Sequence, residues 1–532
     1  TRNGDGTWSP SAEGAFATTC LYTDRNLKRL LVEADGAAPG GGVRPERRTT
    51  AMTYSLTRKL QSVTDPRGFT TVNGYGLCCD RLESITDPSG AITSIAHDFY
   101  GNRISMTDGN GNVTTWTYDG LHRPVSVTNG AGETTSLAYD DNLTDGAGLD
   151  LALAPFLIGL GIGPGSDFSA MRSTNANGEI SSVIRDGLGR TVRTIDGNGN
   201  ASTTVHDTVI GALVETALAD ALGHTVRTRT DGCGFVRERV DAENRLSAAG
   251  ADASHNRIST RDPNGVGMDC TFDRRNRETL CTDTASASRQ TSYDSHGNAI
   301  SRTDALGTVS SAQFDALDRK TQNRDRIAAV TQFAYDPASN LVRITDAEAG
   351  ITEYSYDARN LLVTELFPTG QQGRTRRAYA YDLGRRLIAR QITTVPASAF
   401  SEVTGYFYDG ANRLTQRTYS DGQNDAFAYD LASRLTLAKS LRYQNRVERG
   451  YDPAGRLTRE RLAGEGSAAL PGVWDVFYGY DPANRLLEMT YPDGSVATRG
   501  FTDRNQLASV AFAGQPIASR SYDAGGRLTT TS

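Results

Sequence analysis

A Tyr-Asp or Phe-Asp pair returns every 21 residues along this chain, and this period constrains the fold more than any other feature. A second series of aspartates repeats at the same spacing, offset from the first by ten or eleven residues. A fixed period of this length is typical of a stacked repeat architecture. The clearest run comprises Phe272-Asp273, Tyr293-Asp294, Phe314-Asp315, Tyr335-Asp336 and Tyr356-Asp357, with Asp262, Asp283, Asp304, Asp325 and Asp346 between them.

Each repeat reads as a β-hairpin. In the unit from Tyr118 to Asp140, two clusters rich in Gly, Asp and Asn separate two runs that carry Val, Thr, Leu and aromatic residues. Asp and Asn side chains can hydrogen-bond the backbone two residues on, so both clusters predict turns, and the runs between them suit strands. Single hairpins are marginal in water, so they must stack. The sequence predicts an all-β fold of 21-residue hairpin repeats in one spiralling antiparallel sheet.

The recurring Tyr and Arg residues have expected structural roles. We expect the aromatic residues to form ladders of cross-strand pairs between neighbouring repeats. An Arg follows the Asp by four residues in ten repeats, and a row of Arg would repel itself unless each were matched. We expect pairing with the neighbouring Asp, with an acidic ligand as the alternative. The ten are Arg123, Arg190, Arg277, Arg319, Arg386, Arg413, Arg434, Arg456, Arg485 and Arg527.

The register divides the chain into four parts. We expect an N-terminal segment over 1–21, YD repeats over 22–140, an apolar insertion over 141–170, and further YD repeats over 171–532. Between Asp140 and Asp186 the spacing fits one period plus an insertion of 25, because Asn175 stands where a turn residue should. Wider spacings, from Tyr381 to Tyr408 and from Tyr451 to Tyr480, predict longer hairpin loops on one rim.

The insertion contains the most apolar stretch of the chain, residues 149–165. It is shorter than the ~20 apolar residues of a transmembrane helix and is broken by Pro155 and Pro164. We expect it to pack against the inner face of a shell or a neighbouring subunit, since exposure would promote aggregation. A membrane-active loop is the alternative.

Composition and charge exclude several classes of function. The net charge is −6, and the 56 basic residues, 52 Arg and 4 Lys, are dispersed, so we expect no nucleic-acid partner. Six cysteines do not make a disulfide framework. We interpret Cys270 and Cys281, in repeat strands, and Cys233, near a turn, as small buried hydrophobes. Cys78-Cys79 is a vicinal pair with no further ligand at metal-binding spacing.

Nothing in the sequence predicts catalysis, a cofactor or a metal site, and we assign no site residues. Asp108-Gly-Asn110-Gly-Asn112 and Asp196-Gly-Asn198-Gly-Asn200 resemble calcium loops, but the sixth and twelfth positions do not fit, so turns explain them better. The six histidines occupy repeat positions and do not cluster in sequence, and His97 and His206 replace the Tyr of the pair. The six are His97, His122, His206, His224, His255 and His296.

Units such as Tyr451-Asp-Pro-Ala-Gly-Arg-Leu-Thr458 and Tyr480-Asp-Pro-Ala-Asn-Arg-Leu-Leu487 resemble the YD repeats of the RHS (rearrangement hot spot) family. The resemblance covers roughly residues 22 to 532. It implies a hollow β-shell, as in bacterial RHS toxin shells and Tc toxin cocoon subunits, which encloses a C-terminal toxin released by self-cleavage. It carries over no catalytic residue, because nothing after Tyr522-Asp523 matches the closing motif of toxin-type members.

The resemblance therefore implies a non-catalytic shell segment that encapsulates a C-terminal polypeptide effector, lying outside this chain, for delivery. Its expected partners are that cargo and a secretion or toxin-delivery machinery. The alternative, like the teneurin shells of animals, is a cell-surface adhesion or carbohydrate-binding array, with carbohydrate as partner. A third alternative is an eroded gene fragment. We expect a bacterial protein that is secreted or lies at the cell surface, although residues 1–10 lack the basic and apolar regions of a signal peptide. We also expect the chain to be a piece of a longer protein.

Overall fold

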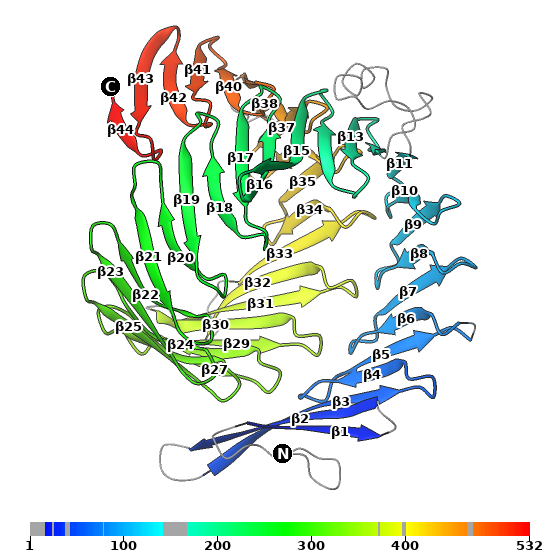
Figure 1. Cartoon of the computed structure of the whole chain (residues 1–532). Helices are drawn as coiled ribbons and strands as arrows, with labels where there is room; N and C mark the ends of the chain where they lie inside the picture. Colours follow the sequence, from blue (N-terminus) through cyan, green and yellow to red (C-terminus); the bar gives the residue numbers. More distant parts are fainter. Residues whose placement is uncertain are drawn as a thin grey trace. The chain divides into compact units, whose positions relative to one another are not determined.

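Antiparallel β-strands make up the regular structure of this protein. The computed structural model describes residues 16–23, 26–37, 43–77, 79–141, 168–370, 373–395, 401–464 and 472–532. Within these ranges lie 44 strands and no helix (Figure 1). Accordingly, this part of the chain contains no helical segment able to cross a membrane. The all-β prediction is confirmed.

The first half of the chain contains the strands β1 (Phe16–Thr23), β2 (Asn26–Ala37), β3 (Val43–Tyr54), β4 (Leu60–Thr64), β5 (Thr70–Tyr75), β6 (Leu82–Thr86), β7 (Ile92–His97), β8 (Arg103–Thr107), β9 (Val113–Tyr118), β10 (Pro124–Thr128), β11 (Thr134–Asp140), β12 (Ser169–Thr174), β13 (Ile180–Arg185), β14 (Thr191–Ile195), β15 (Ala201–Ile210), β16 (Leu213–Ala219), β17 (Thr225–Thr230), β18 (Val236–Val240), β19 (Leu246–Ala251), β20 (Arg257–Arg261), β21 (Gly267–Phe272) and β22 (Glu278–Asp283).

The second half contains β23 (Ser288–Tyr293), β24 (Ala299–Thr303), β25 (Val309–Phe314), β26 (Lys320–Arg324), β27 (Val330–Tyr335), β28 (Leu341–Thr345), β29 (Ile351–Tyr356), β30 (Leu362–Gly370), β31 (Gly373–Tyr381), β32 (Leu387–Val395), β33 (Ser401–Tyr408), β34 (Leu414–Tyr419), β35 (Asn424–Tyr429), β36 (Leu435–Ser440), β37 (Asn445–Tyr451), β38 (Leu457–Gly464), β39 (Val473–Tyr480), β40 (Leu486–Thr490), β41 (Val496–Phe501), β42 (Leu507–Phe512), β43 (Gln515–Tyr522) and β44 (Leu528–Thr531).

Strands that follow one another pair antiparallel, and in most hairpins a five-residue turn joins them. We number the turn from its first residue, usually Asp, as positions 1 to 5. In the turn at Asp336, the N–H of position 1 donates to the carbonyl of position 5, Asn340, and the N–H of position 4, Ser339, donates back to the carbonyl of Asp336. Position 4 has a positive φ, 69° at Ser339. This is a hairpin loop with a bulge, which fixes the strand register.

Two kinds of turn alternate along the chain. Tyr-Asp turns begin directly after the strand that ends in the aromatic residue, as at Asp336. Second-series turns begin at the intervening aspartates, as at Asp346, and have the same backbone hydrogen bonds. Because successive strands run in opposite directions, neighbouring turns of the two kinds lie at opposite ends of the strands. The predicted 21-residue hairpin repeat is therefore confirmed.

The two faces of the sheet differ in chemistry. In β9, Thr114, Trp116 and Tyr118 are half-buried, while Val113, Thr115 and Thr117 on the other face are exposed. The exposed face carries cross-strand hydroxyl pairs, such as Thr117 with Ser126 at 2.6 Å. The same kind of pair joins Thr53 to Ser62, Thr64 to Thr70, and Thr128 to Thr134.

The buried core is thin. Within the described residues, seven apolar residues are buried, and the cluster around Ala170 and Ile184 is formed by neighbouring strands of one sheet. A single sheet layer leaves most side chains partly accessible. Cohesion must therefore come largely from backbone pairing and from the turns.

The strands on either side of each insertion pair directly with each other. β11 pairs directly with β12, Asp140 opposite Ala170, so the chain resumes its register as predicted, and Asn175 begins the next turn. The apolar stretch 149–165 lies outside the described residues. In the later hairpins the strands are longer, nine residues each in β31 and β32. The tips of two of these hairpins, 396–400 and 465–471, are likewise not described. The four-part domain division stays a prediction.

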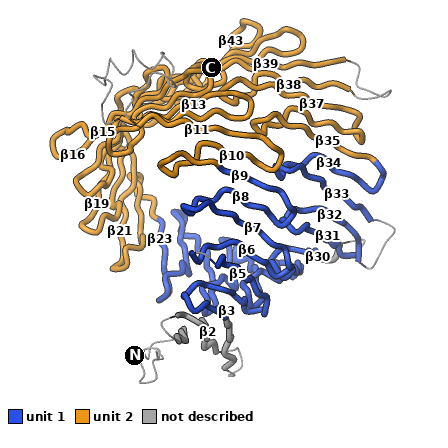
Figure 2. The backbone as a smooth tube through the Cα atoms, turned by 90° about the vertical axis from the view of Figure 1, so that its right-hand side faces the viewer, with its two compact units in different colours: residues 1–116, 289–422 blue, residues 117–288, 423–532 orange. Residues whose placement is uncertain are grey.

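The chain forms two compact units, each made of two stretches distant in sequence (Figure 2). Unit 1 comprises residues 1–116 and 289–422, and unit 2 comprises residues 117–288 and 423–532. Within each unit, turns of the two stretches contact one another. The 21-residue period of the sequence does not predict which turns of the two stretches contact each other.

We expect a whole repeat to be removable at low cost. Deleting residues 294–314 joins Tyr293 to Asp315 and restores a Tyr-Asp turn, so the melting temperature should fall by less than about 5 °C. Deleting residues 294–303 reverses the direction of every later strand and moves the following turns to the opposite ends of the strands. That variant should melt far lower or aggregate. Thermal melts followed by circular dichroism that show equal damage would contradict this register.

Candidate functional site

The repeated turn is the most elaborate polar feature of the described residues, and one carboxylate oxygen organises it. At Asp119, Oδ1 accepts hydrogen bonds from the backbone N–H groups of Leu121 and Arg123, at positions 3 and 5. Turns at Asp186, Asp315 and Asp409 repeat this pattern. The side chain thus satisfies two N–H groups that strand pairing does not reach.

The second carboxylate oxygen, Oδ2, accepts from the side chain at position 5. All ten predicted Arg residues form an ion pair with the Asp four residues before them, so the expected structural pairing is confirmed. In the turn at Asp273, the hydrogen bond from the Arg277 side chain is the main cause that lowers the pKa of the carboxyl. The pairs are Asp119–Arg123, Asp186–Arg190, Asp273–Arg277, Asp315–Arg319, Asp382–Arg386, Asp409–Arg413, Asp430–Arg434, Asp452–Arg456, Asp481–Arg485 and Asp523–Arg527.

The same guanidinium links its turn to the next Tyr-Asp turn. Arg456 donates from Nε to Asp452 at 2.7 Å and from Nη1 to the carbonyl of Asp481 at 3.0 Å. A further bond from Nη1 reaches Oδ1 of Asn484, position 4 of that next turn, at 2.8 Å. Its guanidinium also lies 4.9 Å from the ring centroid of Tyr480, a cation–π contact. A planar group with several donors can make all these contacts at once, whereas a Lys cannot.

The recurring Tyr residues contact the preceding hairpin through their hydroxyl groups. The hydroxyl of Tyr356 donates to the carbonyl of Leu341 at 2.9 Å, and Tyr335 makes the same bond to Lys320. Some of these rings also receive a cation–π contact from a turn Arg, as Tyr335 does from Arg319. The expected ladder of aromatic pairs stays a prediction. His206, which stands in for Tyr, contacts the carbonyl of Thr191 at 2.9 Å through Nε2.

Inside unit 1, second-series turns of the first stretch contact Tyr-Asp turns of the second. Arg67 donates to Oδ1 of Asn360 at 2.6 Å, and the N–H of Gly384 donates to Oδ1 of Asn110 at 2.8 Å. At Gly109, a Cβ atom would lie 2.5 Å from the carbonyl oxygen of Leu383, so the approach requires glycine. A hollow of about 410 Å³, lined by Asp87 and Arg359 among others, lies beside these turns.

Unit 2 contains the same kind of contact. Asn198 donates to Asp452 at 3.0 Å, and Arg504 pairs with Asp241 at 2.8 Å. Arg434 adds an ion pair with Glu179 at 2.8 Å. The partners are 254 residues apart in the first case and 255 in the last. In both units, therefore, the turn side chains serve as contacts between distant stretches.

Ion pairs also extend along the strands. Asp475 on β39 accepts from Arg461 at 2.9 Å and from Arg459 at 2.8 Å, both on β38. These two guanidinium groups, Arg461 first, lower the pKa of Asp475 to about 2. Such networks fix side chains on the sheet without forming a reactive centre.

The calcium-like segments are turns, as predicted. Oδ1 of Asp108 accepts from the N–H groups of Asn110 and Asn112, and its Oδ2 accepts from the Asn112 amide. The segment at Asp196 has the same bonds. The carboxylate lone pairs are thus directed at the turn itself.

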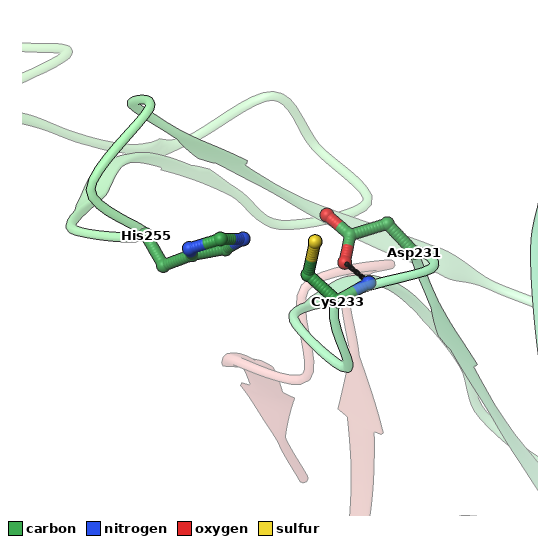
Figure 3. A group of neighbouring side chains, drawn as sticks. All are labelled: Asp231, Cys233 and His255. Atoms are coloured by element: carbon green, nitrogen blue, oxygen red, sulfur yellow. Dashed lines mark hydrogen bonds between the residues drawn. The ribbon is translucent and has the colours of Figure 1, made fainter.

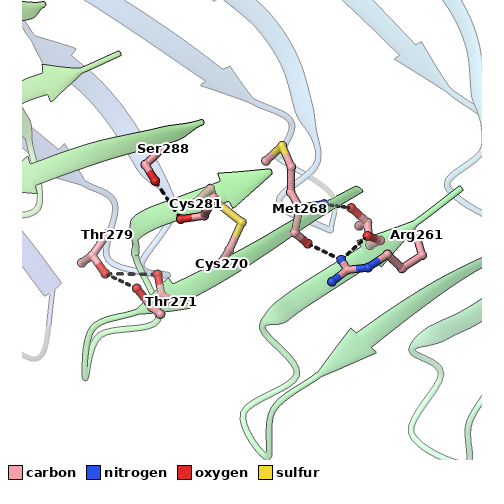
Figure 4. Close-up of a disulfide and its surroundings, with 9 residues drawn as sticks. Arg261, Met268, Cys270, Thr271, Thr279, Cys281 and Ser288 are labelled. Carbon is pink, nitrogen blue, oxygen red and sulfur yellow. Dashed lines mark hydrogen bonds between the residues drawn. A yellow bond between two sulfur atoms is a disulfide. The ribbon is translucent and has the colours of Figure 1, made fainter. Parts of the chain in front are cut away.

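The structure corrects the interpretation of two cysteines. Cys270 and Cys281, which we expected to be free hydrophobes, form a disulfide across β21 and β22 (Figure 4). They lie directly opposite each other in the strand register, with Cα atoms 4.1 Å apart. The sequence carries the signal, because Cys270 lies three residues before the turn at Asp273 and Cys281 lies four residues after it, and the bulge beside the turn makes up the difference of one residue. Cys233 is an exposed free thiol instead of a buried one, and Cys78 lies outside the described residues.

Comparisons with known proteins agree with this geometry. Residues 97–134, 335–372 and 451–496 match the family model of the RHS repeat. A search of curated proteins gives no match. The crystal structure of TcdB2-TccC3-Cdc42 contains a chain similar to this one, with a TM-score of 0.50 and 12% identity over 97% of this chain and 36% of that chain. A second similar chain is found in the structure of the Photorhabdus luminescens Tc holotoxin pore with a TccC3 mutation. The identity is 12%, the match covers 94% of this chain and 36% of that chain, and the TM-score is 0.46.

At this identity, the likeness to TcdB2-TccC3-Cdc42 establishes the fold alone. This chain spans about a third of the length of the chain it matches, 36%. The likeness therefore does not assign the activity or the partners of that longer chain to this one.

Removing a turn carboxylate should destabilise the array. Oδ1 of Asp346 accepts from the N–H groups of Glu348 and Gly350, so Asp346→Ala should lower the free energy of unfolding by about 1–2 kcal/mol. Glu348→Ala, two residues away in the same turn, is the control and should change it by less than ~0.5 kcal/mol. Urea titrations of both variants check this. Equal effects would show that the carboxylate does not organise the turn.

Acid should weaken the β38–β39 ion network. Because the pKa of Asp475 is lowered in the folded state, to about 2, its stabilisation is present above the unfolded pKa of ~3.9 and is lost as the pH falls through about 2. The melting temperature of Asp475→Asn should therefore be below that of the parent at about pH 6, and the difference should vanish near pH 2. Exposed Glu488, replaced by Gln, is the control. A constant difference across this window would contradict the assignment.

Proposed function

We propose that this RHS-repeat protein is a non-catalytic wall segment that encloses a polypeptide cargo, a C-terminal effector outside this chain, for delivery to a target cell. The observation that carries the proposal is the hairpin array, which matches the RHS repeat and has the fold of a chain in TcdB2-TccC3-Cdc42 over 97% of its length. Relatives of this type imply a toxin-delivery machinery as a further partner.

The physics of the array suits a wall. Neighbouring strands satisfy each other's backbone groups, which limits exposed strand edges to the ends of the array. At the hairpin ends, turn carboxylates such as that of Asp119 accept hydrogen bonds from backbone N–H groups of the loop. One face carries small hydroxyl side chains, such as Thr117 and Ser126, with exposed apolar residues such as Val113 among them. A surface of this kind can separate a cargo from its surroundings without reacting with it.

The disulfide supports a location outside the reducing cytosol. Cys270–Cys281 would form and persist in a secreted or cell-surface protein, whereas cytosolic thiols are kept reduced. We therefore propose a secreted or cell-surface location. This is the setting that delivery of an effector requires.

A second candidate is an adhesion or carbohydrate-binding array. The observation in its favour is a hollow of about 570 Å³ in unit 2, lined by Arg237, Arg239, Arg257 and Arg261 with Ser247. Guanidinium and hydroxyl groups there could donate hydrogen bonds to an acidic sugar. Glycan-array binding by the intact protein, lost on Arg239→Ala, would favour this alternative.

The mass of the complete gene product tests the cargo proposal. We expect native mass spectrometry to give the full-length mass and denaturing conditions to release a C-terminal fragment, because an enclosed effector is held without a covalent bond. The matched sample is the product truncated after residue 532, which should give one mass in both conditions. A single intact full-length species in both conditions would contradict enclosure of a cleaved cargo and favour the adhesion alternative.

A further inference from the structure

Neighbouring Tyr-Asp turns bring position 3 of one turn against position 4 of the next. His296, at position 3 of the Asp294 turn, contacts Asp318, at position 4 of the Asp315 turn, with Nδ1 and Oδ1 3.1 Å apart. The array therefore places the side chains of these two positions within contact distance at regular intervals. Their chemistry varies from one turn to the next.

At the turns of Asp231 and Asp252, these two positions hold metal-binding residues. Cys233 is at position 3 of the first turn and His255 is at position 4 of the second. The thiol of Cys233, an imidazole nitrogen of His255 and a carboxylate oxygen of Asp231 all lie within 4.8 Å of one another. Figure 3 shows the three side chains directed toward a common point between the two loops. Cys233 and His255 are exposed, so a cation can reach them from solvent.

Asp231 belongs to the turns in which the side chain of the fifth residue does not bond the carboxylate, as in the turn at Asp346, where that residue is Gly350. Position 5 of its turn is Phe235, so no Arg or Asn at that position occupies Oδ2. Oδ1 still accepts from the N–H groups of Cys233 and Phe235, which keeps the turn intact. Oδ2 accepts one bond, from Nε of Arg237 at 2.8 Å. A carboxylate oxygen with one donor retains a lone pair for a cation.

Arg237, which donates to Oδ2 of Asp231, also lies 4.9 Å from the ring centroid of Phe235, a cation–π contact. The ring of Phe235 can therefore hold this guanidinium beside the site when Oδ2 bonds a cation.

We propose that Cys233, His255 and Asp231 bind a divalent cation of borderline softness such as Zn²⁺, which links the two consecutive hairpins. Thiolate, imidazole and carboxylate are the ligands that Zn²⁺ takes in proteins, in tetrahedral geometry, and water fills the fourth position. Bonds of about 2.0–2.3 Å require ligand atoms about 3.3–3.8 Å apart, so side-chain rotation of roughly an ångström closes the site. The thiol loses its proton on binding.

The site would act as a cross-link between turns. Elsewhere the connection between these positions is a hydrogen bond, for example between Nδ1 of His296 and Oδ1 of Asp318 at 3.1 Å. At Cys233 and His255 a metal ion would supply it. The proposal does not depend on what the array encloses.

The test uses Co²⁺ as a spectroscopic probe and Zn²⁺ as its competitor, on the full chain carrying Cys78→Ser and Cys79→Ser. That background removes the vicinal pair, which could bind soft metals independently. We expect one equivalent of Co²⁺ to give a thiolate-to-metal charge-transfer band that Zn²⁺ abolishes. Cys233→Ser should remove the band, and His255→Ala should weaken Co²⁺ affinity at least tenfold.

The matched control is His122→Ala. His122 occupies position 4 of its turn with a φ of 64°, against 62° for His255, but its repeat contains no cysteine. The control should leave the band and the affinity unchanged. Absence of a charge-transfer band in the background protein, or a band that survives in both Cys233→Ser and His255→Ala, would overturn the proposal. Circular dichroism confirms that each variant retains its strands.

Discussion

The structure depends on one hydrogen-bonding arrangement, in which an aspartate oxygen accepts two backbone N–H groups of its own turn. A single-layer sheet of short strands has little buried apolar surface, so an apolar core cannot hold the strand ends in place. The Oδ1 bonds, seen at Asp119 with Leu121 and Arg123, fix the loop and the bulge that follow each strand. The fixed loop sets the strand register, and the register decides which face of the sheet each side chain occupies. The regular 21-residue period depends on the same loop.

Side chains of the turn also make contacts at longer range. Arg456 bonds Oδ2 of Asp452 in its own turn and uses a second nitrogen to connect consecutive Tyr-Asp turns. Asn198, at position 3 of its turn, bonds Asp452, which is 254 residues away in the sequence. The turn side chains thus take part in both local closure and distant contact.

Much of this could be predicted from the sequence, because the interactions that define the repeat are local. The Asp-to-Arg spacing of four residues implied the ion pairs, and Asn175 marked the turn that follows the insertion. Contacts between residues hundreds of positions apart, such as Arg67 with Asn360, have no local signal, because any two turns have similar chemistry. The hydroxyl bond of Tyr356 to the carbonyl of Leu341 was not predicted, because a backbone carbonyl acceptor leaves no mark in the sequence.

Two features that involve cysteines follow from their positions within the repeat. Cys270 lies three residues before the turn at Asp273 and Cys281 four residues after it, and the bulge of this hairpin places them opposite each other. Cys233 and His255 are 22 residues apart, one period plus one position, and adjacent turns bring those positions together. Neither pair follows a familiar motif, so spacing relative to the period is the informative quantity.

The multiple contacts of each turn guanidinium also explain why ammonium groups are so scarce. Arg456 bonds its own Asp, the next turn and a Tyr ring at once, and a Lys at the same place would lose most of these contacts. The chain has 52 Arg and 4 Lys. Amine-directed reagents will therefore find few attachment points on this protein. Arginine-selective reagents such as glyoxals should instead report on how tightly individual turns are held.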